Sequence, residues 1–503
     1  MRTPKKDRFC ARFLKNKAAN VAILFGLSLF PILFTIGAAV DYGRAYAAQK
    51  RFSQAIDAAA LAIGSTADLS NQQIQEMAQA FLDANYPPEE VGATSQINVS
   101  SDSSSVTIDV TGYVETTFLK VAGIDTLDVG AFVEVMRTHK KIELVMVLDN
   151  TGSMSWSGKL GALKTAANTL LDILMPKAQH SANGDVKIGL VPFAAAVNIG
   201  PEKLNSGWVD TNALSDVAWE DFAAGTNVLT LYDGINNRSW NGCVRARNEP
   251  YDTTDTPPAV ATPATLWAPY FAPDEPDFSW YANTYRSDKG YTGSKYDYDA
   301  RQRYTGKYDG TPIAGWESDG PDDNCRISQV TPMTANHGDV QSGIGLMSAT
   351  GYTVIPAGLA WGWRLISPDE PFTEGSAYDD EEYVKAIVLL TDGENDVNGG
   401  TGNHNGSRYS AYGYAQSGHL GSASGNQAES VLNDKTAELC TNIKNEGIMI
   451  FSITFQLSDG PIKDLMRDCA TSTTTYFDSP NNSELQDIFK EIAIGLSKLR
   501  ISK

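Results

Sequence analysis

The chain has 503 residues, of which 42% are hydrophobic and 20% charged, and its formal net charge at pH 7 is −20. This length gives room for two or three domains with at least one large core, and the composition is that of a globular chain. The acidic balance argues against a nucleic-acid-binding protein, because no basic surface is available to neutralise phosphates. It is compatible with an extracytoplasmic protein that binds hard cations.

Residues 18–40 carry the strongest topological signal. They read AANVAILFGLSLFPILFTIGAAV, 23 positions without a charge, and a helix of about 20 such residues spans a bilayer. One acid, Asp7, and seven basic residues precede this run: Arg2, Lys5, Lys6, Arg8, Arg12, Lys15 and Lys17. The positive-inside rule therefore places residues 1–17 in the cytoplasm and the chain after Val40 outside the membrane. The alternative is a signal peptide cleaved near AYA at 45–47.

The five cysteines are distributed in a way that agrees with this topology. Cys10 falls on the predicted cytoplasmic side, which leaves four cysteines outside. Four cysteines allow three pairings, and an oxidising compartment favours bonding them. We expect the pairs Cys243–Cys325 and Cys440–Cys469, because each pair brackets one contiguous segment. Four free buried thiols are the alternative.

The region 41–140 is predicted to be a helical and β stalk. In DYGRAYAAQKRFSQAIDAAALAIGS, apolar side chains recur every three or four residues, which predicts that the membrane helix continues to about residue 64. A second helix, NQQIQEMAQAFLDANY, is expected to end before Pro87 and Pro88. Residues 95–136 alternate apolar and polar side chains, a pattern typical of a small antiparallel sheet.

From residue 141 to residue 500 the pattern becomes that of a doubly wound α/β domain. The segments IELVMVLD, VKIGLVPF, VKAIVLLTD and GIMIFSITF are almost wholly apolar, and amphipathic helical stretches lie between them. Strands buried on both faces and joined by helices indicate a parallel sheet covered on both sides. The final helix, NSELQDIFKEIAIGLSKLR, is expected to be capped by Asn481 or Asn482.

Two insertions interrupt this domain. Residues 198–330 are rich in Tyr, Trp, Asp, Gly and Pro, and residues 397–428 in Gly, Ser, Asn and His. Long excursions from a compact fold are usually functional or disordered. The aromatic content of the first predicts a folded insertion, whereas the glycine content of the second predicts a mobile loop.

Two carboxylates stand at the ends of apolar strands. Asp149 ends IELVMVLD and Asp392 follows IVLLT, and ligands of a doubly wound sheet bind beyond the carboxyl ends of its strands. In DNTGSMS, the hydroxyls of Thr151 and Ser153 lie on one side of an extended loop. Such a cluster of hard oxygens suits Mg²⁺, Mn²⁺ or Ca²⁺ and suits zinc or copper poorly. Because hydroxyls donate little charge, the bound cation would still seek another anion.

Three segments resemble the metal-ion-dependent adhesion site of von Willebrand factor A (VWA) domains: DNTGSMS, GYTVIPAGL and LLTDGEN. In that family the first loop reads D-x-S-x-S, a later loop supplies a threonine, and a further strand ends in an aspartate. The matching residues here are Asp149, Thr151, Ser153, Thr353 and Asp392. The resemblance implies a VWA (Rossmann-like) domain over 141–500. It also implies that the hydroxyls contact Mg²⁺ directly, that the aspartates act mostly through water, and that a partner carboxylate fills the open position.

This resemblance has two departures from the family pattern. Thr151 stands where serine is usual, although it keeps the hydroxyl. The gap from Ser153 to Thr353 is far longer than the family norm, and the insertion 198–330 accounts for it. A degenerate site that no longer binds metal is the alternative.

The N-terminal third resembles the TadG-like proteins of Tad/Flp pilus assembly, through its basic head, its single membrane helix and DYGRAYAAQKRFSQAIDAAALA. Members of that family commonly carry a C-terminal VWA domain. The resemblance implies a single-pass protein of the bacterial inner membrane whose C-terminal domain lies in the periplasm, or at the cell surface within the pilus. Its partners would be pilus or pilus-assembly proteins, bound through an acidic side chain that completes the metal coordination.

The two resemblances leave two versions of this function open. The chain either stays in the membrane as an assembly factor or enters the fibre as a minor subunit, with the VWA domain at the tip. The first glycine is Gly26 and the first glutamate is Glu76. The spacing of a prepilin-peptidase site, with glycine before the cut and glutamate five residues after it, therefore does not occur.

A metal-dependent phosphohydrolase of the extracytoplasmic space is the alternative from another class. An aspartate at a strand end followed by hydroxyls is similar to the D-x-D-x-T motif of haloacid-dehalogenase-type phosphatases. Here Thr151 replaces the second aspartate, and a threonine cannot serve as the general acid at neutral pH. No G-x-S-x-G elbow supplies a serine nucleophile. We therefore expect a binding protein and not an enzyme.

Overall fold

The structure is a computed structural model. It describes residues 17–64, 71–85, 93–101, 105–136, 140–176, 185–277, 283–310, 312–313, 320–398, 404–417, 419–421 and 424–501. The chain divides into two compact units: residues 1–139 with 501–503, called the N-terminal unit, and residues 140–500, called the C-terminal unit. The expected cytoplasmic segment, with Cys10, lies outside the described residues except for Lys17.

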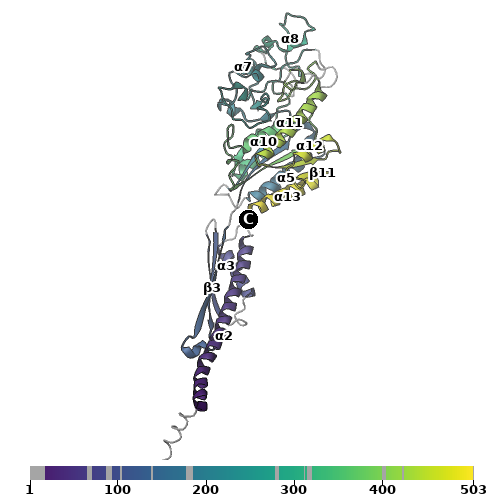
Figure 1. Cartoon of the computed structure of the whole chain (residues 1–503). Helices are drawn as coiled ribbons and strands as arrows, with labels where there is room; N and C mark the ends of the chain where they lie inside the picture. The colour runs from purple at the N-terminus through teal and green to yellow at the C-terminus, as the bar shows by residue number, and fades with distance from the viewer. Residues whose placement is uncertain are drawn as a thin grey trace, which may run out of the picture. The chain divides into compact units, whose positions relative to one another are not determined.

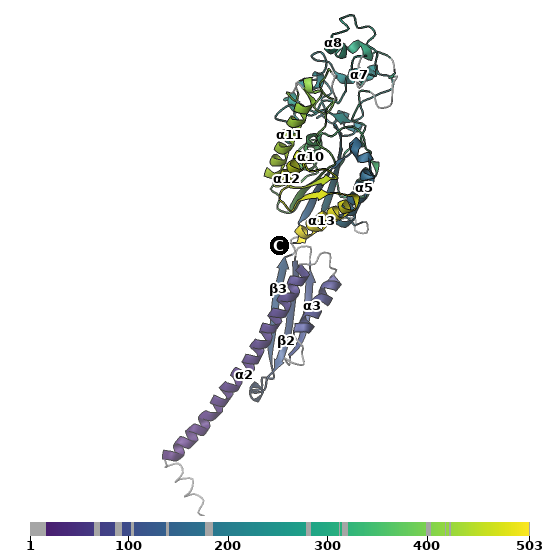
Figure 2. The same cartoon turned by 90° about the vertical axis from the view of Figure 1, so that its right-hand side faces the viewer.

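The N-terminal unit is a three-stranded antiparallel sheet with two helices. In chain order its elements are α2 Lys17–Gly64, α3 Asn71–Asn85, β1 Ala93–Ser101, β2 Ser105–Glu115, the 3-10 helix η1 Leu119–Ala122 and β3 Thr126–Met136. Both helices pack on one face of the sheet, where Phe52 of α2 and Leu82 of α3 join Val106, Ile108 and Val110 of β2 in a single core (Figure 2).

Helix α2 changes character along its length. Its apolar half is long and apolar enough to cross a membrane, and almost none of it is buried within the structure. Before Asp41, large apolar side chains such as Leu33 and Ile36 are exposed, whereas after it Ala48 and Phe52 are buried against the sheet. The predicted continuous helix from the apolar run to residue 64 is therefore present.

The C-terminal unit is built on a six-stranded sheet in the order β11-β10-β9-β4-β5-β8. Its strands are β4 Lys141–Asp149, β5 Val186–Phe193, β8 Thr331–Thr334, β9 Tyr383–Thr391, β10 Met449–Phe455 and β11 Tyr476–Ser479. All neighbours are parallel except β8, which runs antiparallel to β5. The predicted doubly wound α/β class is confirmed.

Helices cover both faces of this sheet. They are η2 Gly152–Ser155, α5 Lys159–Leu174, α9 His337–Leu346, α10 Ile355–Ile366, α11 Gly425–Asn445, α12 Pro461–Cys469 and α13 Asn482–Ile501. Asn481 caps α13, because its side-chain oxygen accepts hydrogen bonds from the backbone N–H groups of Ser483 and Glu484. Figure 1 shows α10 and α11 on one side of the sheet and α5 and α13 on the other.

The central strand β4 explains this layering. Side chains of a strand alternate between its two faces. Val145 and Val147 pack with α10, α11 and α12, and Leu144 and Met146 pack with α5, α9 and α13. Because both faces are apolar and covered, polar side chains are concentrated at the strand ends.

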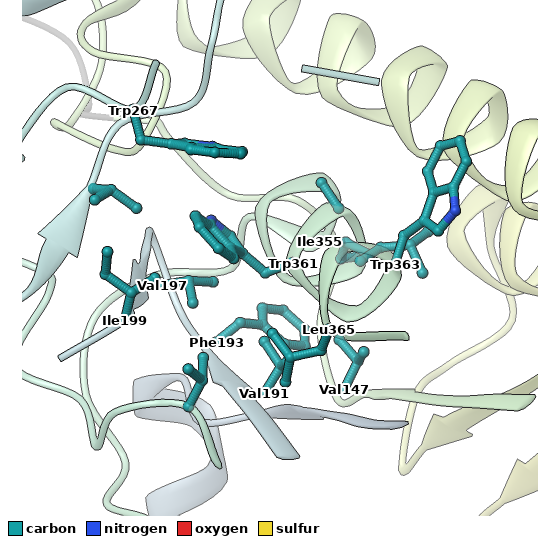
Figure 3. Packing of buried hydrophobic residues seen from close by; sticks show 14 of the residues in the cluster. Val147, Val191, Phe193, Val197, Ile199, Trp267, Ile355, Trp361, Trp363 and Leu365 are labelled. Carbon is teal, nitrogen blue, oxygen red and sulfur yellow. The ribbon is translucent and has the colours of Figure 1, made fainter. Parts of the chain in front are cut away.

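The described residues of the first insertion are folded, as its aromatic content predicts. Its short elements are β6 Val197–Asn198, η3 Pro201–Asn205, α6 Asp216–Trp219, α7 Val228–Gly234, β7 Cys243–Val244, η4 Pro263–Thr265, α8 Tyr298–Gln302 and η5 Thr305–Tyr308. Its buried aromatic side chains continue the core above α10. Trp267 and Trp361 have ring centroids 5.1 Å apart, and Trp361 lies above Phe193 of the sheet (Figure 3).

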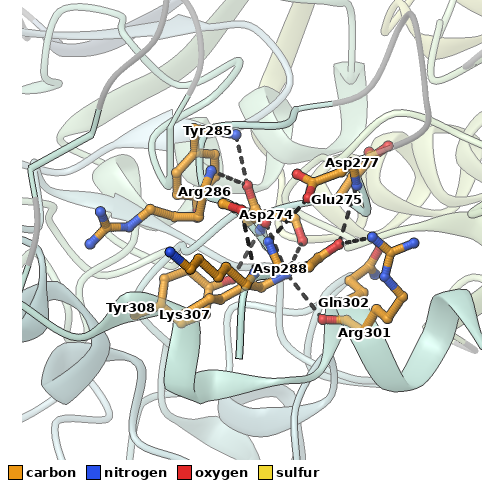
Figure 4. A network of polar contacts seen from close by, with 12 residues as sticks. Asp274, Glu275, Asp277, Tyr285, Arg286, Asp288, Arg301, Gln302, Lys307 and Tyr308 are labelled. Carbon is orange, nitrogen blue, oxygen red and sulfur yellow. Dashed lines mark hydrogen bonds and ion pairs between the residues drawn. The ribbon is translucent and has the colours of Figure 1, made fainter. Parts of the chain in front are cut away.

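Buried charges hold the far part of this insertion together (Figure 4). The ammonium of Lys307 has no exposed surface and lies 2.9 Å from Asp274 and 3.3 Å from Asp288. Arg301 makes a further ion pair with Asp288. Burying a charge is costly unless it is paired, so these ion pairs offset the cost of burying Lys307 in the insertion.

The expectation of a mobile loop is wrong for residues 404–417 of the second insertion. Tyr409, Tyr412 and Tyr414 are buried in one cluster with Tyr270 of the first insertion, and the segment ends in the 3-10 helix η6 Ala415–Ser417. The prediction was wrong because it considered only the glycine content, whereas the tyrosine side chains of the same segment pack into the core. Residues 399–403, 418 and 422–423 lie outside the described part.

The structure contains both favoured cysteine pairings. Cys243–Cys325 closes an 82-residue segment of the first insertion, with 6.3 Å between Cα atoms. Cys440–Cys469 links α11 to α12, with 5.0 Å between Cα atoms. Each bond restricts the unfolded chain more than the folded one.

Glu275 in the first insertion makes the stability of the C-terminal unit depend on pH. The side chain is 3% exposed and accepts a 2.9 Å hydrogen bond from the Tyr414 hydroxyl. Burial raises the pKa of Glu275 to about 7, and the nearby charge of Asp323 acts in the same direction. Since its unfolded pKa is about 4.3, the folded state binds more protons between these values. The free energy of unfolding therefore falls as pH rises from about 4 to 7.

Glu275→Gln should remove this part of the pH dependence, worth about 4 kcal/mol over that range. The amide oxygen still accepts from Tyr414, so the variant should be more stable than wild type at pH 8. Urea unfolding of a 140–500 fragment between pH 4 and 8 measures the difference. Glu491→Gln, at an exposed position on α13, is the control and should leave the slope unchanged. An unchanged slope in Glu275→Gln would contradict the assignment.

Candidate metal centre

The five predicted site residues meet at the carboxyl edge of the sheet. β4 and β9 are parallel neighbours, with Leu148 paired to Leu390, so Asp149 and Asp392 leave the sheet side by side. Thr151 and Ser153 follow β4 at the start of η2. Thr353 lies just before α10, which begins at Ile355.

Asp149 is completely buried and holds two loops. One carboxylate oxygen accepts the backbone N–H of Thr151 at 2.8 Å, and the other accepts the hydroxyl of Thr391 at 2.8 Å. Burial, together with the neighbouring charge of Asp392, raises the pKa of Asp149 to about 6 despite these hydrogen bonds. A carboxylate in such a position favours a nearby cation.

Two hydroxyls and one carboxylate oxygen converge beside it. The hydroxyl oxygens of Thr151 and Ser153 are 2.9 Å apart. Both lie near the same Oδ1 atom of Asp392, at 3.5 Å for Thr151 and 2.5 Å for Ser153. The three oxygen atoms therefore face a common point.

The loop that carries Thr353 is fixed from both sides. The N–H of Gly152 donates to the carbonyl of Gly351 at 3.0 Å. Gly351 has φ +72°, and a Cβ there would stand 2.8 Å from the carbonyl oxygen of Asn324 in the first insertion, so a side chain is excluded. Thr353 is buried, and its hydroxyl would lie 3.2 Å from a Cβ on Gly393. This contact places the hydroxyl beside the turn that follows Asp392.

The donor set fits a hard cation. Adjacent ligands of octahedral Mg²⁺, at about 2.1 Å from the metal, lie about 3 Å apart. The distances between the Thr151, Ser153 and Asp392 oxygens, 2.5–3.5 Å, bracket this value. Across the described part of the chain, no group of three or more His, Cys, Asp or Glu side chains is placed to hold a metal. The candidate site has two carboxylates, and its other oxygen ligands would be hydroxyl groups.

Lys159 is the residue that the sequence analysis missed. It opens α5, is 12% exposed, and its ammonium lies 2.8 Å from the Oδ2 atom of Asp392. A positive charge in the first turn of a helix is unfavourable, because it lies at the positive end of the helix dipole. A lysine at this position therefore indicates that an acidic side chain lies nearby to compensate for it. Asp392 thus presents one oxygen to the hydroxyls and the other to an internal cation. The hydroxyl of Thr391, which binds Asp149, was missed as well.

The comparison with protein families matches residues 19–65 to the Tad family, described as Flp pilus-assembly TadE/G-like. This match covers the apolar run and the helical continuation after it. The N-terminal segment is TadE/G-like. A comparison with curated proteins finds no match.

Solved structures similar to this chain include two pilus proteins. The pilus adhesin SpaC from Lactobacillus rhamnosus GG is 12% identical, with a TM-score of 0.34; the alignment covers 80% of this chain and 34% of SpaC. The vWF domain of the type V pili tip protein Mfa5 from Porphyromonas gingivalis is 11% identical, with a TM-score of 0.34 and coverage of 73% and 97%. The alignment thus spans about a third of the length of SpaC. The fold class of this chain rests on its own strand order.

Proximal thread matrix protein 1 from the mussel byssus is a third similar structure, described with a zinc-occupied MIDAS motif. It is 12% identical, with a TM-score of 0.29, and the alignment covers 72% of this chain and 46% of that one.

Lys159→Met should raise the affinity of the C-terminal unit for Mg²⁺. The substitution keeps most of the apolar stem but removes a positive charge that touches Asp392, and a loss of about 1.4 kcal/mol of repulsion corresponds to about tenfold in affinity. Calorimetric titration of the 140–500 fragment with MgCl₂ measures it. Lys164→Met removes the same charge from α5, where the ammonium binds the carbonyl of Gly345 instead, and should change little. Equal Mg²⁺ affinities for Lys159→Met and wild type would contradict the idea that Lys159 competes with the cation for Asp392.

Proposed function

We propose that this chain is a membrane-anchored component of a Tad/Flp-type pilus system whose C-terminal unit binds a protein partner through a divalent cation. The observation that carries the proposal is the convergence of the Thr151, Ser153 and Asp392 oxygens beside the buried carboxylate of Asp149. The TadE/G-like segment at residues 19–65 supports the pilus system. The helix around it, long and apolar enough to cross a membrane, supports the anchor.

Each site residue has a distinct task in this proposal. Asp149 fixes the positions of the first loop and of Thr391. The hydroxyls of Thr151, Ser153 and Thr353 offer neutral oxygens, and Asp392 offers one charged oxygen. When bound, Mg²⁺, Mn²⁺ or Ca²⁺ supplies a positive centre with a position left for a carboxylate oxygen of the partner.

Binding fits this geometry better than hydrolysis. A phosphohydrolase of the aspartyl type needs an exposed nucleophilic carboxylate, yet Asp149 has no exposed surface and both of its oxygens are hydrogen-bonded. The position of the general acid is held by Thr151. We therefore propose a non-enzymatic protein, and incubation with an aryl phosphate should give no turnover.

The proposed topology has the N-terminus in the cytoplasm and the C-terminal unit in the periplasm or on the cell surface. The basic residues before the apolar run favour this orientation. The disulfides Cys243–Cys325 and Cys440–Cys469 support it, because such bonds persist in oxidising compartments.

The metal centre predicts a specific pattern among Thr353 variants. Thr353→Val removes the hydroxyl at nearly constant shape and should weaken Mg²⁺ binding by about tenfold or more, whereas Thr353→Ser keeps the hydroxyl and should bind like wild type. Asp149→Ala should abolish the thermal stabilisation that Mg²⁺ gives to the 140–500 fragment. Calorimetric titration and thermal unfolding measure these effects. Equal Mg²⁺ affinity in wild type, Thr353→Val and Asp149→Ala would overturn the site.

Shear fractionation of piliated cells separates the two versions of the function. A minor subunit should be recovered with the released fibres, which would place the C-terminal unit on the pilus. An assembly factor should remain with the inner membrane, where the metal centre would bind another component of the machine. Recovery from the cytosol alone would contradict both versions.

A further inference from the structure

The hairpin tip between β2 and β3, residues 116–125, carries apolar side chains that point away from the core. Phe118 is 46% exposed, Val121 is 75% exposed and Ile124 is 42% exposed. Only Leu119 of η1 is buried. Packing within the N-terminal unit therefore does not account for the exposed surface of these three side chains.

The tip is tightly built. The hydroxyl of Thr116 bonds the carbonyls of Ile124 and Asp125, and the N–H of Ile124 donates to the carbonyl of Leu119 at 3.2 Å. Gly123 turns the chain with φ +82°. The outward direction of the apolar side chains is thus set by a closed turn rather than by a loose loop.

The tip is docked on α2 at the end of the apolar run. The carboxylate of Asp41 accepts the backbone N–H groups of Thr117, Phe118 and Leu119 at 2.8–3.0 Å. A Cβ on Gly37 would stand 2.5 Å from the Cβ of Phe118, so the glycine allows the ring to lie against the helix. These contacts fix the tip at the level of residues 37–41.

The same level of α2 has the features of a membrane boundary. Leu33 and Ile36 before this level and Val40 within it are exposed and apolar. Tyr42 and Tyr46 beyond it are 62% and 66% exposed, and exposed aromatic side chains of this kind lie at the interface between lipid and water. Arg44 and the exposed Lys120 of the tip suit anionic headgroups at that depth.

We propose that the β2–β3 tip is a second membrane contact, in which Phe118, Val121 and Ile124 enter the leaflet from which α2 emerges. The inference rests on the proposed anchoring of α2 in the bilayer. The lipid surface is the occupant that the contacts favour, because the tip shares its level with the end of an apolar helix and pairs apolar side chains with a lysine. The contact restrains the tilt and rotation of α2 relative to the membrane.

Nitroxide labels on the full-length chain test this contact. The chain is prepared with Cys10→Ser and both disulfides intact, and reconstituted into vesicles of phosphatidylethanolamine and phosphatidylglycerol. Labels are placed at Val121→Cys on the tip, at Glu134→Cys on the exposed face of β3, and at Leu27→Cys on α2. Power saturation compares the access of oxygen, which concentrates in lipid, with that of a water-soluble nickel complex. We expect the oxygen-to-nickel ratio at residue 121 to be several-fold above that at 134 and below that at 27.

Each other outcome overturns the inference in a distinct way. Equal ratios at 121 and 134, with residue 27 in lipid, would remove the tip contact and leave the anchor intact. A water-exposed residue 27 would remove the anchor and the tip contact together. A label at 121 that is shielded from both reagents, increasingly so at higher protein-to-lipid ratio, would show that a second copy of the chain covers the tip instead.

Discussion

The C-terminal unit depends on a carboxylate that cannot reach water. Asp149 ends the central strand with no exposed surface, and its two oxygens bind the loop after β4 and the last residue of β9. Burying a charge is costly unless partners offset it. Hydrogen bonds offset part of this cost here, yet the charge of Asp392 adds to it. In the proposed function, a cation at the neighbouring oxygens would offset the rest of this cost.

The insertions take part in shaping that edge. The first insertion places the carbonyl of Asn324 against Gly351, next to the disulfide-bonded Cys325. The N–H of Val354 donates to the carbonyl of Ala194 at the end of β5. The loop of Thr353 is therefore held between the insertion and the sheet. The insertion that lengthens the sequence between Ser153 and Thr353 forms a wall beside this loop and leaves the Thr353 hydroxyl at the edge of the sheet. The aromatic packing of Trp267 on Trp361 joins this wall to α10.

The sequence predicts the parts of this molecule that depend on local pattern. Asp149 and Asp392 could be placed together because the carboxyl ends of neighbouring parallel strands share one edge, and the continuous α2 follows from apolar spacing. Contacts between segments that are distant in the sequence could not be predicted from local pattern. The role of Lys159 is visible only from its ion pair with Asp392, 233 residues later. The role of Asp41 is visible only from its hydrogen bonds to a turn 76 to 78 residues later. The mobility prediction for residues 404–417 was wrong because it used glycine content alone. Tyr409 packs against the distant Tyr270, with ring centroids 5.0 Å apart, and composition does not reveal that contact.

The net charge of the candidate metal centre favours a partner that brings a carboxylate. Two carboxylates and the ammonium of Lys159 leave the site with a net charge of −1. A divalent cation changes this to +1, and a carboxylate from a partner restores neutrality. In a partly buried site an uncompensated unit charge is unfavourable, so the proposed cation and an acidic partner would stabilise one another. Without Lys159 the cation alone would neutralise the site, and the demand for a partner carboxylate would fall. In the proposed function, Lys159 would therefore lower the affinity for the metal and raise the dependence of metal binding on the partner carboxylate.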